Sequence, residues 1–186
     1  GVQTCALPIY DFDFYNSISR LIIGRYYLYK SSSVLMKEIC SADSSTFKHV
    51  RFVLTDMDET LTYKGRLAAE TYMALERLQN AGVNMIPVTV APAGWSDQMA
   101  WMWPVDGVIG ENGGVFFRRQ NDGHGIESFF CHATEKYPDV AGRLMQIGEQ
   151  IKREIPAAHF ADDQPFRMTS IAFVKPPEAH QCSLIR

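Results

Sequence analysis

The sequence predicts an α/β protein built on a Rossmann-like, doubly wound parallel sheet, followed by the beginning of a second α/β unit. Three apolar runs of strand length, at residues 50–54, 83–89 and 105–110, alternate with two segments of helical spacing. Strands that alternate with helices along a chain favour a parallel sheet with helices packed on it. A further helix and strand after His132 predict the second unit.

The first strand and the first helix follow from apolar spacing. Residues 50–54 form a short apolar run, of the kind expected for a strand buried on both faces. Helical spacing begins at Leu67 and continues through Leu75 and Leu78. Gly82 then ends the helix, because glycine readily adopts the left-handed conformation found after a helix.

The second strand is predicted at residues 83–89 and ends in the hydroxyl of Thr89. Pro87 has no N–H to donate to a neighbouring strand, so its place in a central strand requires a local irregularity. Pro92 suits the first turn of a helix, where no N–H is needed. This helix carries Trp101.

Residues 105–110 are predicted to form the third strand, and residues 111–114 follow it as a turn. Apolar segments on both sides of the turn residues 121–123 predict a β-hairpin. Residues 138–155 form a long amphipathic helix closed by a proline. Residues 170–174 are the last predicted strand.

The predicted organisation is an N-terminal extension at residues 1–46, a first α/β unit at 47–131 and a partial second unit at 132–186. Residues 1–9 read GVQTCALPI, which resembles the conceptual translation of a sequencing adapter, so we expect them to be foreign to the protein. We expect the native start near Met36 and a non-native or disordered extension before it; a natural extension is the alternative. The chain ends soon after the last predicted strand without a closing element, so we expect a truncated chain.

Composition and charge argue against several classes of protein. The formal net charge is −3 and there is no basic stripe, which gives no support for nucleic-acid binding. The longest apolar runs are far too short to span a membrane. The cysteines are far apart and form no CxxC pair, which argues against a zinc site and for reduced thiols: Cys5, Cys40, Cys131 and Cys182. We therefore expect a cytoplasmic enzyme.

The motif that carries chemistry is residues 56–62, Asp-Met-Asp-Glu-Thr-Leu-Thr, directly after the first strand. In open α/β sheets, ligands bind in the crevice at the carboxyl ends of the strands. At such a turn, Asp56 and Asp58 can both reach one Mg²⁺ and one phosphorus atom. The motif therefore predicts metal-assisted phosphoryl transfer.

Residues 53–62 resemble the first motif of the haloacid dehalogenase (HAD) superfamily, hhhhDxDxTLT. Residues 86–89 fit its second motif, a strand that ends in Thr or Ser. Residues 108–114 look like the ENG segment of its Cof-type branch, which includes sugar-phosphate phosphatases. The resemblance extends from about residue 47 to residue 174. It implies an incomplete HAD core, the beginning of an α/β cap, and Mg²⁺-dependent hydrolysis of a phosphomonoester.

The same resemblance implies a role for each site residue. Asp56 would be the nucleophile that becomes an aspartyl-phosphate, and Asp58 would protonate the leaving oxygen and then deprotonate the attacking water. Mg²⁺ would be held by the Asp56 carboxylate and by the backbone carbonyl of Asp58. Met57, Thr89 and Asn112 would contact the phosphate or the rest of the substrate, which we expect to be a sugar or polyol phosphate. As alternatives, Thr89 caps its strand and Asn112 only forms the turn before two glycines.

The chain departs from the family pattern in two ways. Val90 and Ala91 stand where members often carry Gly-Arg, so an arginine that could pair with substrate is absent there. The acidic pair of the fourth motif does not follow, and Lys175 is a weak candidate for the lysine of the third motif. We therefore expect a fragment with little phosphatase activity.

Two other functions stay open: a phosphotransferase or phosphomutase of the same superfamily, and a non-catalytic binding module that keeps the fold. His124 and His132 have no carboxylate at a ligand spacing and are expected to be loop residues. The tryptophans at 95, 101 and 103 are expected in the core rather than in a sugar-binding platform. Residues 162–164 either form an exposed turn or reach substrate from the second unit.

Overall fold

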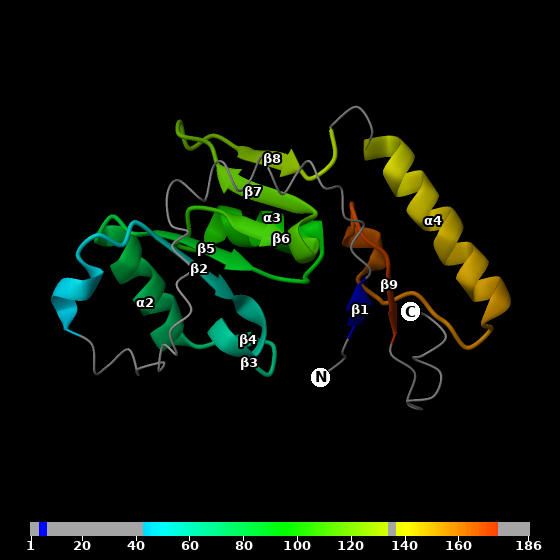
Figure 1. The fold of residues 1–186 in the computed structure, drawn as a ribbon, viewed down its shortest axis with the longest axis horizontal. Helices are drawn as coiled ribbons and strands as arrows, with labels where there is room; N and C mark the ends of the chain where they lie inside the picture. Colours follow the sequence, from blue (N-terminus) through cyan, green and yellow to red (C-terminus); the bar gives the residue numbers. More distant parts are fainter. Residues whose placement is uncertain (1–3, 7–42, 134–136, 175–186) are drawn as a thin grey trace, which may run out of the picture.

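The computed structural model describes residues 4–6, 43–133 and 137–174. The predictions made for Met36, for Lys175 and for the cysteines at 40 and 182 lie outside these residues. The main element is a five-stranded sheet with the strand order β2-β5-β6-β7-β8 (Figure 1). Its strands are β2 (Phe52–Asp56), β5 (Asn84–Val88), β6 (Val108–Gly110), β7 (Val115–Arg119) and β8 (Ile126–Phe130).

The sheet is mixed. Strands β2, β5 and β6 are parallel, whereas β7 and β8 continue the sheet as an antiparallel hairpin. Strand β5 pairs with β2 along its whole length but with β6 only at Val88 and Ile109. This short ladder accommodates the missing N–H of Pro87. The predicted α/β, Rossmann-like class is confirmed.

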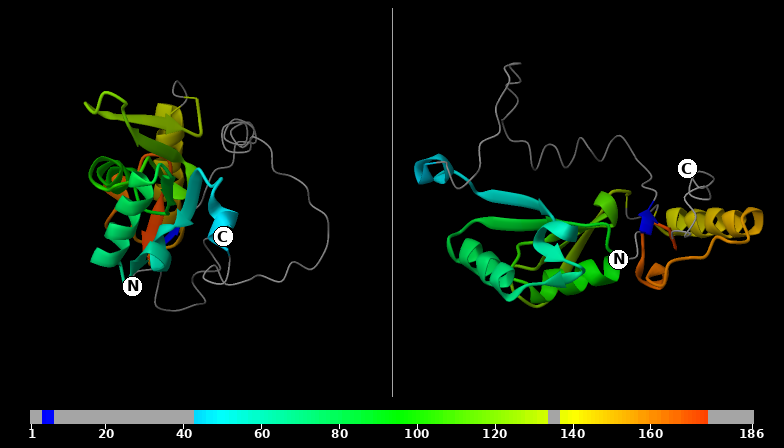
Figure 2. Two further views of the ribbon diagram at one scale, coloured as in Figure 1. Left: turned by 90° about the vertical axis from the view of Figure 1, so that its left-hand side faces the viewer. Right: turned by 90° about the horizontal axis from the view of Figure 1, so that it is seen from below.

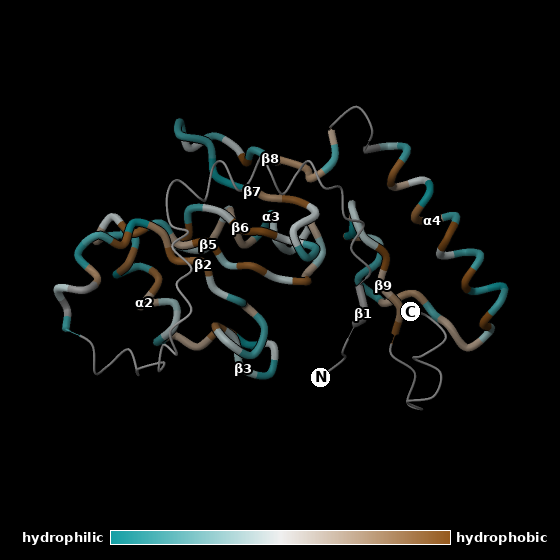
Figure 3. The backbone as a smooth tube through the Cα atoms, viewed as in Figure 1, coloured by the Kyte–Doolittle hydropathy of each residue, from teal (hydrophilic) through white to brown (hydrophobic). Residues whose placement is uncertain are grey.

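Two helices connect the parallel strands. They are α2 (Ala69–Asn80) and α3 (Ala93–Met102), and both lie on the same face of the sheet (Figure 2). This placement is expected because right-handed crossovers between strands added in one direction put their helices on one face. The main core lies between these helices and the sheet; its buried members are Leu75, Met85, Ala93, Ala100, Val105, Val108, Val115 and Phe117. Figure 3 shows hydrophobic residues along β5 and β6 in the middle of the sheet.

Strand β2 differs from the prediction of a strand buried on both faces. It is the end strand in the described part of the sheet, and its exposure alternates along the strand. Phe52 is 61% exposed and Leu54 is 43% exposed, whereas Val53 packs against the main core. The prediction is wrong within the described residues because a short, mostly apolar run does not reveal which of its faces is covered.

The second unit consists of α4 (Tyr137–Glu154), a short helix η6 (Gln164–Phe166) and β9 (Ala172–Val174). It has a core of its own, formed by Leu144, Ala158, Ile171 and Phe173. Along α4, hydrophobic and hydrophilic positions alternate (Figure 3). Ile147 is 46% exposed, although its spacing from Leu144 and Ile151 predicts that it belongs to the apolar face of this helix.

Strand β1 (Thr4–Ala6) pairs antiparallel with β9 at the edge of the second unit (Figure 1). The described chain then resumes with η2 (Ser44–Phe47), whose N-cap is Asp43. Hydrogen bonds from the Ser45 hydroxyl and amide hold the pKa of the Asp43 carboxyl below its ordinary value.

The sequence did not predict the small hairpin between β2 and α2, which consists of β3 (Thr62–Tyr63) and β4 (Arg66–Leu67). Its turn residues Lys64 and Gly65 have φ values of +50° and +70°. The two strands are too short to show a period, and Leu67 was therefore assigned to the helix. No helix in residues 4–6, 43–133 and 137–174 combines the length and the apolar character needed to cross a membrane.

Candidate active site

Asp56 is the last residue of β2, and the chain then makes a single π-helical turn, η3 (Met57–Leu61). Within this turn Asp58 keeps an extended conformation and Glu59 has a φ of +57°. The backbone therefore bends sharply directly after the strand, and both Asp56 and Asp58 remain exposed at the carboxyl end of the sheet. This is the edge at which open α/β sheets bind ligands.

Thr89 brings the second strand to the Asp-Met-Asp turn. Its hydroxyl donates to Asp58 Oδ2 at 2.9 Å, and it accepts a hydrogen bond from the Ala91 amide at 3.0 Å. Thr89 is 2% exposed, so this hydroxyl is presented from a fixed position. Two residues 31 positions apart in the sequence thus meet at one edge of the sheet.

Two other threonines order the turn itself. The Thr60 hydroxyl donates to Asp56 Oδ2 at 3.4 Å, and the Thr62 hydroxyl donates to the carbonyl of Met57 at 3.1 Å. The Met57 side chain is buried, with 5% of its surface exposed. A contact between Met57 and a phosphate would therefore have to come from its backbone.

Asn112 lies next to Thr89 through its backbone. It is the second residue of the short helix η4 (Glu111–Gly113), where its φ is +56°. Its amide donates to the carbonyl of Thr89 at 3.1 Å, while its side chain is exposed. Both roles named for Asn112 are compatible with this placement, because it forms the turn and also lies beside the site.

Two residues close to this site, Glu111 and Arg167, were not predicted from the sequence. Glu111 is 2% exposed, and the side chain of Arg167 is 1% exposed. Charged side chains are rarely buried unless they are paired or hydrogen-bonded, so each of these two must be held by buried partners. The ENG segment drew attention to the asparagine rather than to the glutamate, and nothing in the sequence around Arg167 marks it as buried.

The donor set at the turn is suited to Mg²⁺ in chemical type. Asp56 offers an exposed carboxylate and Asp58 a backbone carbonyl, and Mg²⁺ is usually bound by one or two carboxylates together with other oxygen ligands such as water. In the described part of the chain there is no group of three or more His, Cys, Asp or Glu side chains that could hold a metal ion. The oxygen ligands present at the turn fit Mg²⁺ in chemical type.

The three tryptophans do not all lie in the core as predicted. Trp95 is 50% exposed and Trp101 is 41% exposed, whereas Trp103 packs against the main core. The guanidinium of Arg119 lies over the Trp101 ring, 4.6 Å from its centroid. The prediction fails because α3 is apolar around most of its surface, so spacing did not identify the side that faces the sheet.

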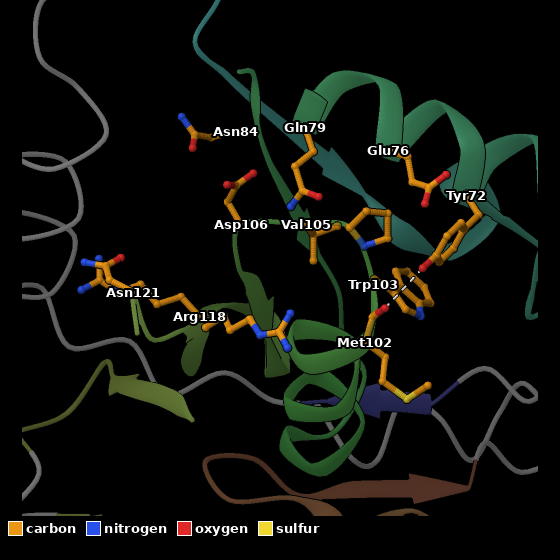
Figure 4. Close-up of a pocket in the computed structure, with 12 residues that line it drawn as sticks. Tyr72, Glu76, Gln79, Asn84, Met102, Trp103, Val105, Asp106, Arg118 and Asn121 are labelled. Atoms are coloured by element: carbon orange, nitrogen blue, oxygen red, sulfur yellow. Dashed lines mark hydrogen bonds between the residues drawn. The ribbon is translucent and has the colours of Figure 1, made fainter. Parts of the chain in front are cut away.

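A cavity of about 500 Å³ is lined by none of the predicted site residues (Figure 4). It is lined by Tyr72 and Glu76 of α2, by Asp106 before β6 and by Arg118 of β7. These residues belong to the amino-terminal side of the parallel strands, whereas Asp56 and Thr89 lie at their carboxyl ends. The Asp106 carboxylate accepts a hydrogen bond from the Met85 amide at 2.8 Å, so this polar group of the cavity lining stabilises the fold.

Comparison with known proteins gives matches of structure only. No protein-family model matches the chain, and no curated protein matches it. A protein from Thermoplasma acidophilum superposes with a TM-score of 0.50 at 18% identity, covering 74% of this chain and 55% of that one. This chain therefore spans little more than half the length of the Thermoplasma protein.

Two proteins from Bacteroides thetaiotaomicron match more loosely. A haloacid dehalogenase-like hydrolase has a TM-score of 0.35 at 11% identity, covering 73% of this chain and 76% of that one. A protein described among the phosphatases of the HAD superfamily has a TM-score of 0.31 at 13% identity, covering 83% of this chain and 75% of that one. Superpositions this loose carry no structural conclusion. What the structure and the Thermoplasma match establish together is the fold: a Rossmann-like α/β sheet flanked by helices.

Proposed function

We propose that this protein is a Mg²⁺-dependent phosphomonoester hydrolase of the HAD type that works through an aspartyl-phosphate. One observation carries most of the proposal: the 2.9 Å hydrogen bond from the Thr89 hydroxyl to Asp58. It joins the Asp-Met-Asp turn after one strand to the hydroxyl that ends the next strand, in the chain order that the HAD motifs require. Chance similarity of either segment alone does not explain their meeting at the carboxyl edge of a parallel pair.

Asp56 and Asp58 are the residues that would hold Mg²⁺. When bound, the ion would reduce the repulsion between the Asp56 carboxylate and an incoming phosphate. Asp56 is exposed at the end of β2, and Thr60 orients one of its oxygens. The other oxygen of this carboxylate is available for attack on phosphorus.

The proposed reaction has two steps. In the first, an Asp56 oxygen forms a bond to phosphorus, the bond from phosphorus to the ester oxygen breaks, and Asp58 gives its proton to that leaving oxygen. In the second, Asp58 takes a proton from water, the water oxygen bonds to phosphorus, and the bond between Asp56 and phosphorus breaks to release phosphate. The Thr89 hydroxyl has one hydrogen to donate, so it can donate to a phosphoryl oxygen only by breaking its hydrogen bond to Asp58. Substrate binding would therefore free the Asp58 carboxyl from Thr89.

We propose a phosphorylated small molecule, a sugar or polyol phosphate, as the substrate, and the cytoplasm as the location. The substrate class is supported by the resemblance of residues 108–114 to the ENG segment of the Cof-type branch. The location is supported by the absence of a CxxC pair and by the lack of a membrane-spanning helix among the described residues.

The first experiment is hydrolysis of p-nitrophenyl phosphate in the presence of Mg²⁺. We expect slow turnover, because the chain lacks the acidic pair and a clear lysine of the third motif. If turnover is fast and Asp56→Asn abolishes it, the missing groups are not needed. The same result would support the role of Asp56 as nucleophile.

A second experiment does not depend on turnover. Beryllofluoride bonds to carboxylates that accept phosphoryl groups, so titration with beryllofluoride and Mg²⁺ should give a bound ¹⁹F NMR signal. We expect Asp56→Asn to lose this signal and the control Asp139→Asn, an exposed carboxylate on α4, to keep it. The proposal is rejected if the unaltered protein shows no bound signal that depends on Asp56.

A further inference from the structure

Glu111 has a buried carboxylate that five hydrogen bonds satisfy. Its Oε1 accepts the amides of Ala93 at 2.9 Å and Met168 at 2.8 Å. Its Oε2 accepts the Thr169 amide at 2.7 Å, the Thr169 hydroxyl at 2.8 Å and the Ser170 hydroxyl at 2.8 Å. A carboxylate 2% exposed is stable only with such partners. It therefore ties the start of α3 to residues 168–170 of the second unit.

The backbone at Glu111 is strained to make these contacts possible. Glu111 and Asn112 have φ values of +51° and +56°, and Gly113 follows with +97°. Left-handed conformations in residues other than glycine persist when the surrounding contacts over-determine them. The same turn reaches the loop after β5, because the Glu111 amide donates to the carbonyl of Ala91 at 3.1 Å.

Arg167 reaches the same loop from the second unit. Its guanidinium forms a two-pronged ion pair with Asp163, at 3.1 and 2.8 Å. Its Nη1 donates to the carbonyl of Val90 and to the Ser170 hydroxyl, both at 3.1 Å. Because the side chain is 1% exposed and its charge is paired, Arg167 is not placed to bind phosphate itself.

Three consecutive carbonyls, those of residues 89–91, are thereby held one by one. The Asn112 amide binds the carbonyl of Thr89, Arg167 binds that of Val90, and the Glu111 amide binds that of Ala91. The loop that carries the Thr89 hydroxyl thus has its conformation set by the Glu111 turn on one side and by Arg167 on the other.

We propose that Glu111 and Arg167 are positioning residues, which hold residues 89–91 so that the Thr89 hydroxyl meets Asp58 and an incoming phosphoryl group. The role at the phosphoryl group rests on the proposed function. Residues 163–170 of the second unit then set the geometry of the loop that follows the second strand.

The first test is hydrogen exchange at the amides of Ala91 and Asn112. In Glu111→Gln, the new amide group presents N–H donors to the Thr169 amide, which cannot accept them, so the contact opens. We expect exchange at both amides to quicken about tenfold, the effect of losing one charge-assisted hydrogen bond. Arg167→Lys, which cannot form the two-pronged pair, should act in the same direction. The matched control Glu127→Gln alters an exposed pair with Arg118 and should leave these amides unchanged.

The second test is the affinity for beryllofluoride at Asp56, measured by ¹⁹F NMR. We expect Glu111→Gln and Arg167→Lys to weaken it about tenfold. Ile151→Ala is the control. It loosens the core of the second unit and should lower stability, but the Ile151 side chain makes no hydrogen bond to residues 163–170. Well below its melting temperature, this variant should bind beryllofluoride as tightly as the unaltered protein.

Each result decides between the two proposals. Unchanged exchange at Ala91 and Asn112 in both variants overturns the positioning role. Equal weakening of beryllofluoride by Ile151→Ala also overturns it, because the effect would then be one of stability. If the unaltered protein forms no adduct that depends on Asp56, the proposed function fails and the role at the phosphoryl group fails with it. The exchange experiment still decides whether Glu111 and Arg167 hold the loop.

Discussion

The hydroxyl of Thr89 donates a hydrogen bond to Asp58 and accepts one from the Ala91 amide. Thr89→Val keeps the shape of the side chain but removes both hydrogen bonds and leaves the buried Ala91 amide without its acceptor. We expect a loss of about 1–3 kcal/mol in the free energy of unfolding. Urea denaturation measures this loss.

Thr89→Ser is the matched control, because serine retains the hydroxyl. It should keep the hydrogen bond to Asp58 and lose less stability than the valine variant. Equal stability of Thr89→Val and the unaltered protein would contradict the view that this hydroxyl is needed by the fold as well as by the site.

Helix α4 offers a prediction at the scale of one element, because its two glycines differ in surroundings. A Cβ at Gly148 would lie 2.6 Å from the ring of Phe160, whereas a Cβ at Gly142 meets nothing within 4 Å. Phe160 stacks on Phe173 at 4.9 Å between centroids and is therefore not free to move aside. Gly148→Ala should destabilise the protein by about 1–3 kcal/mol through overpacking.

Gly142→Ala is expected to do the opposite. The position is exposed and helical, so alanine should stabilise the protein by about 0.5–1 kcal/mol through its greater helix propensity. Thermal unfolding followed by circular dichroism compares the two variants. If both alanine variants shift the melting temperature in the same direction, Gly148 is not packed tightly against Phe160 as the structure has it.

At the scale of the whole molecule, two hydrophobic cores are joined through Glu111. The main core lies under α2 and α3, and the second lies between α4 and β9. All three tryptophans are in α3 or directly after it, so fluorescence reports the surroundings of α3, whereas far-ultraviolet circular dichroism also reports α4. We expect the two signals to change at the same urea concentration in the unaltered protein, as in a cooperative transition.

Glu111→Ala removes the acceptor of four hydrogen bonds between the units, and we expect it to separate the two transitions. The signal of α4 should change at lower urea than the tryptophan fluorescence, since the smaller core has fewer buried side chains to hold it. Glu127→Ala, which removes an exposed carboxylate, should leave the transitions coincident. Coincident transitions in Glu111→Ala would mean that other contacts couple the units.

Local patterns in the sequence were sufficient for much of the fold. Alternating apolar runs and helical spacing predicted the strands and helices, since these patterns depend on residues close together in the chain. The Asp-Met-Asp turn after the first strand was likewise visible, and the strand order explains why Thr89 ends beside it. The short hairpin of β3 and β4 escaped because its four residues show no period.

The burial of individual side chains depended on tertiary structure, because a side chain is buried only when another part of the chain packs over it. The sequence determined by itself that this is an α/β chain with an Asp-Met-Asp turn at the end of its first strand. Only the tertiary structure decided that Phe52 and Trp95 are exposed, that Glu111 is buried, and that Arg167 reaches a carbonyl 77 residues away. The physical reason is that spacing along a chain specifies a helix or strand and its faces, whereas contacts across the fold select the face that is covered and the charges that are enclosed.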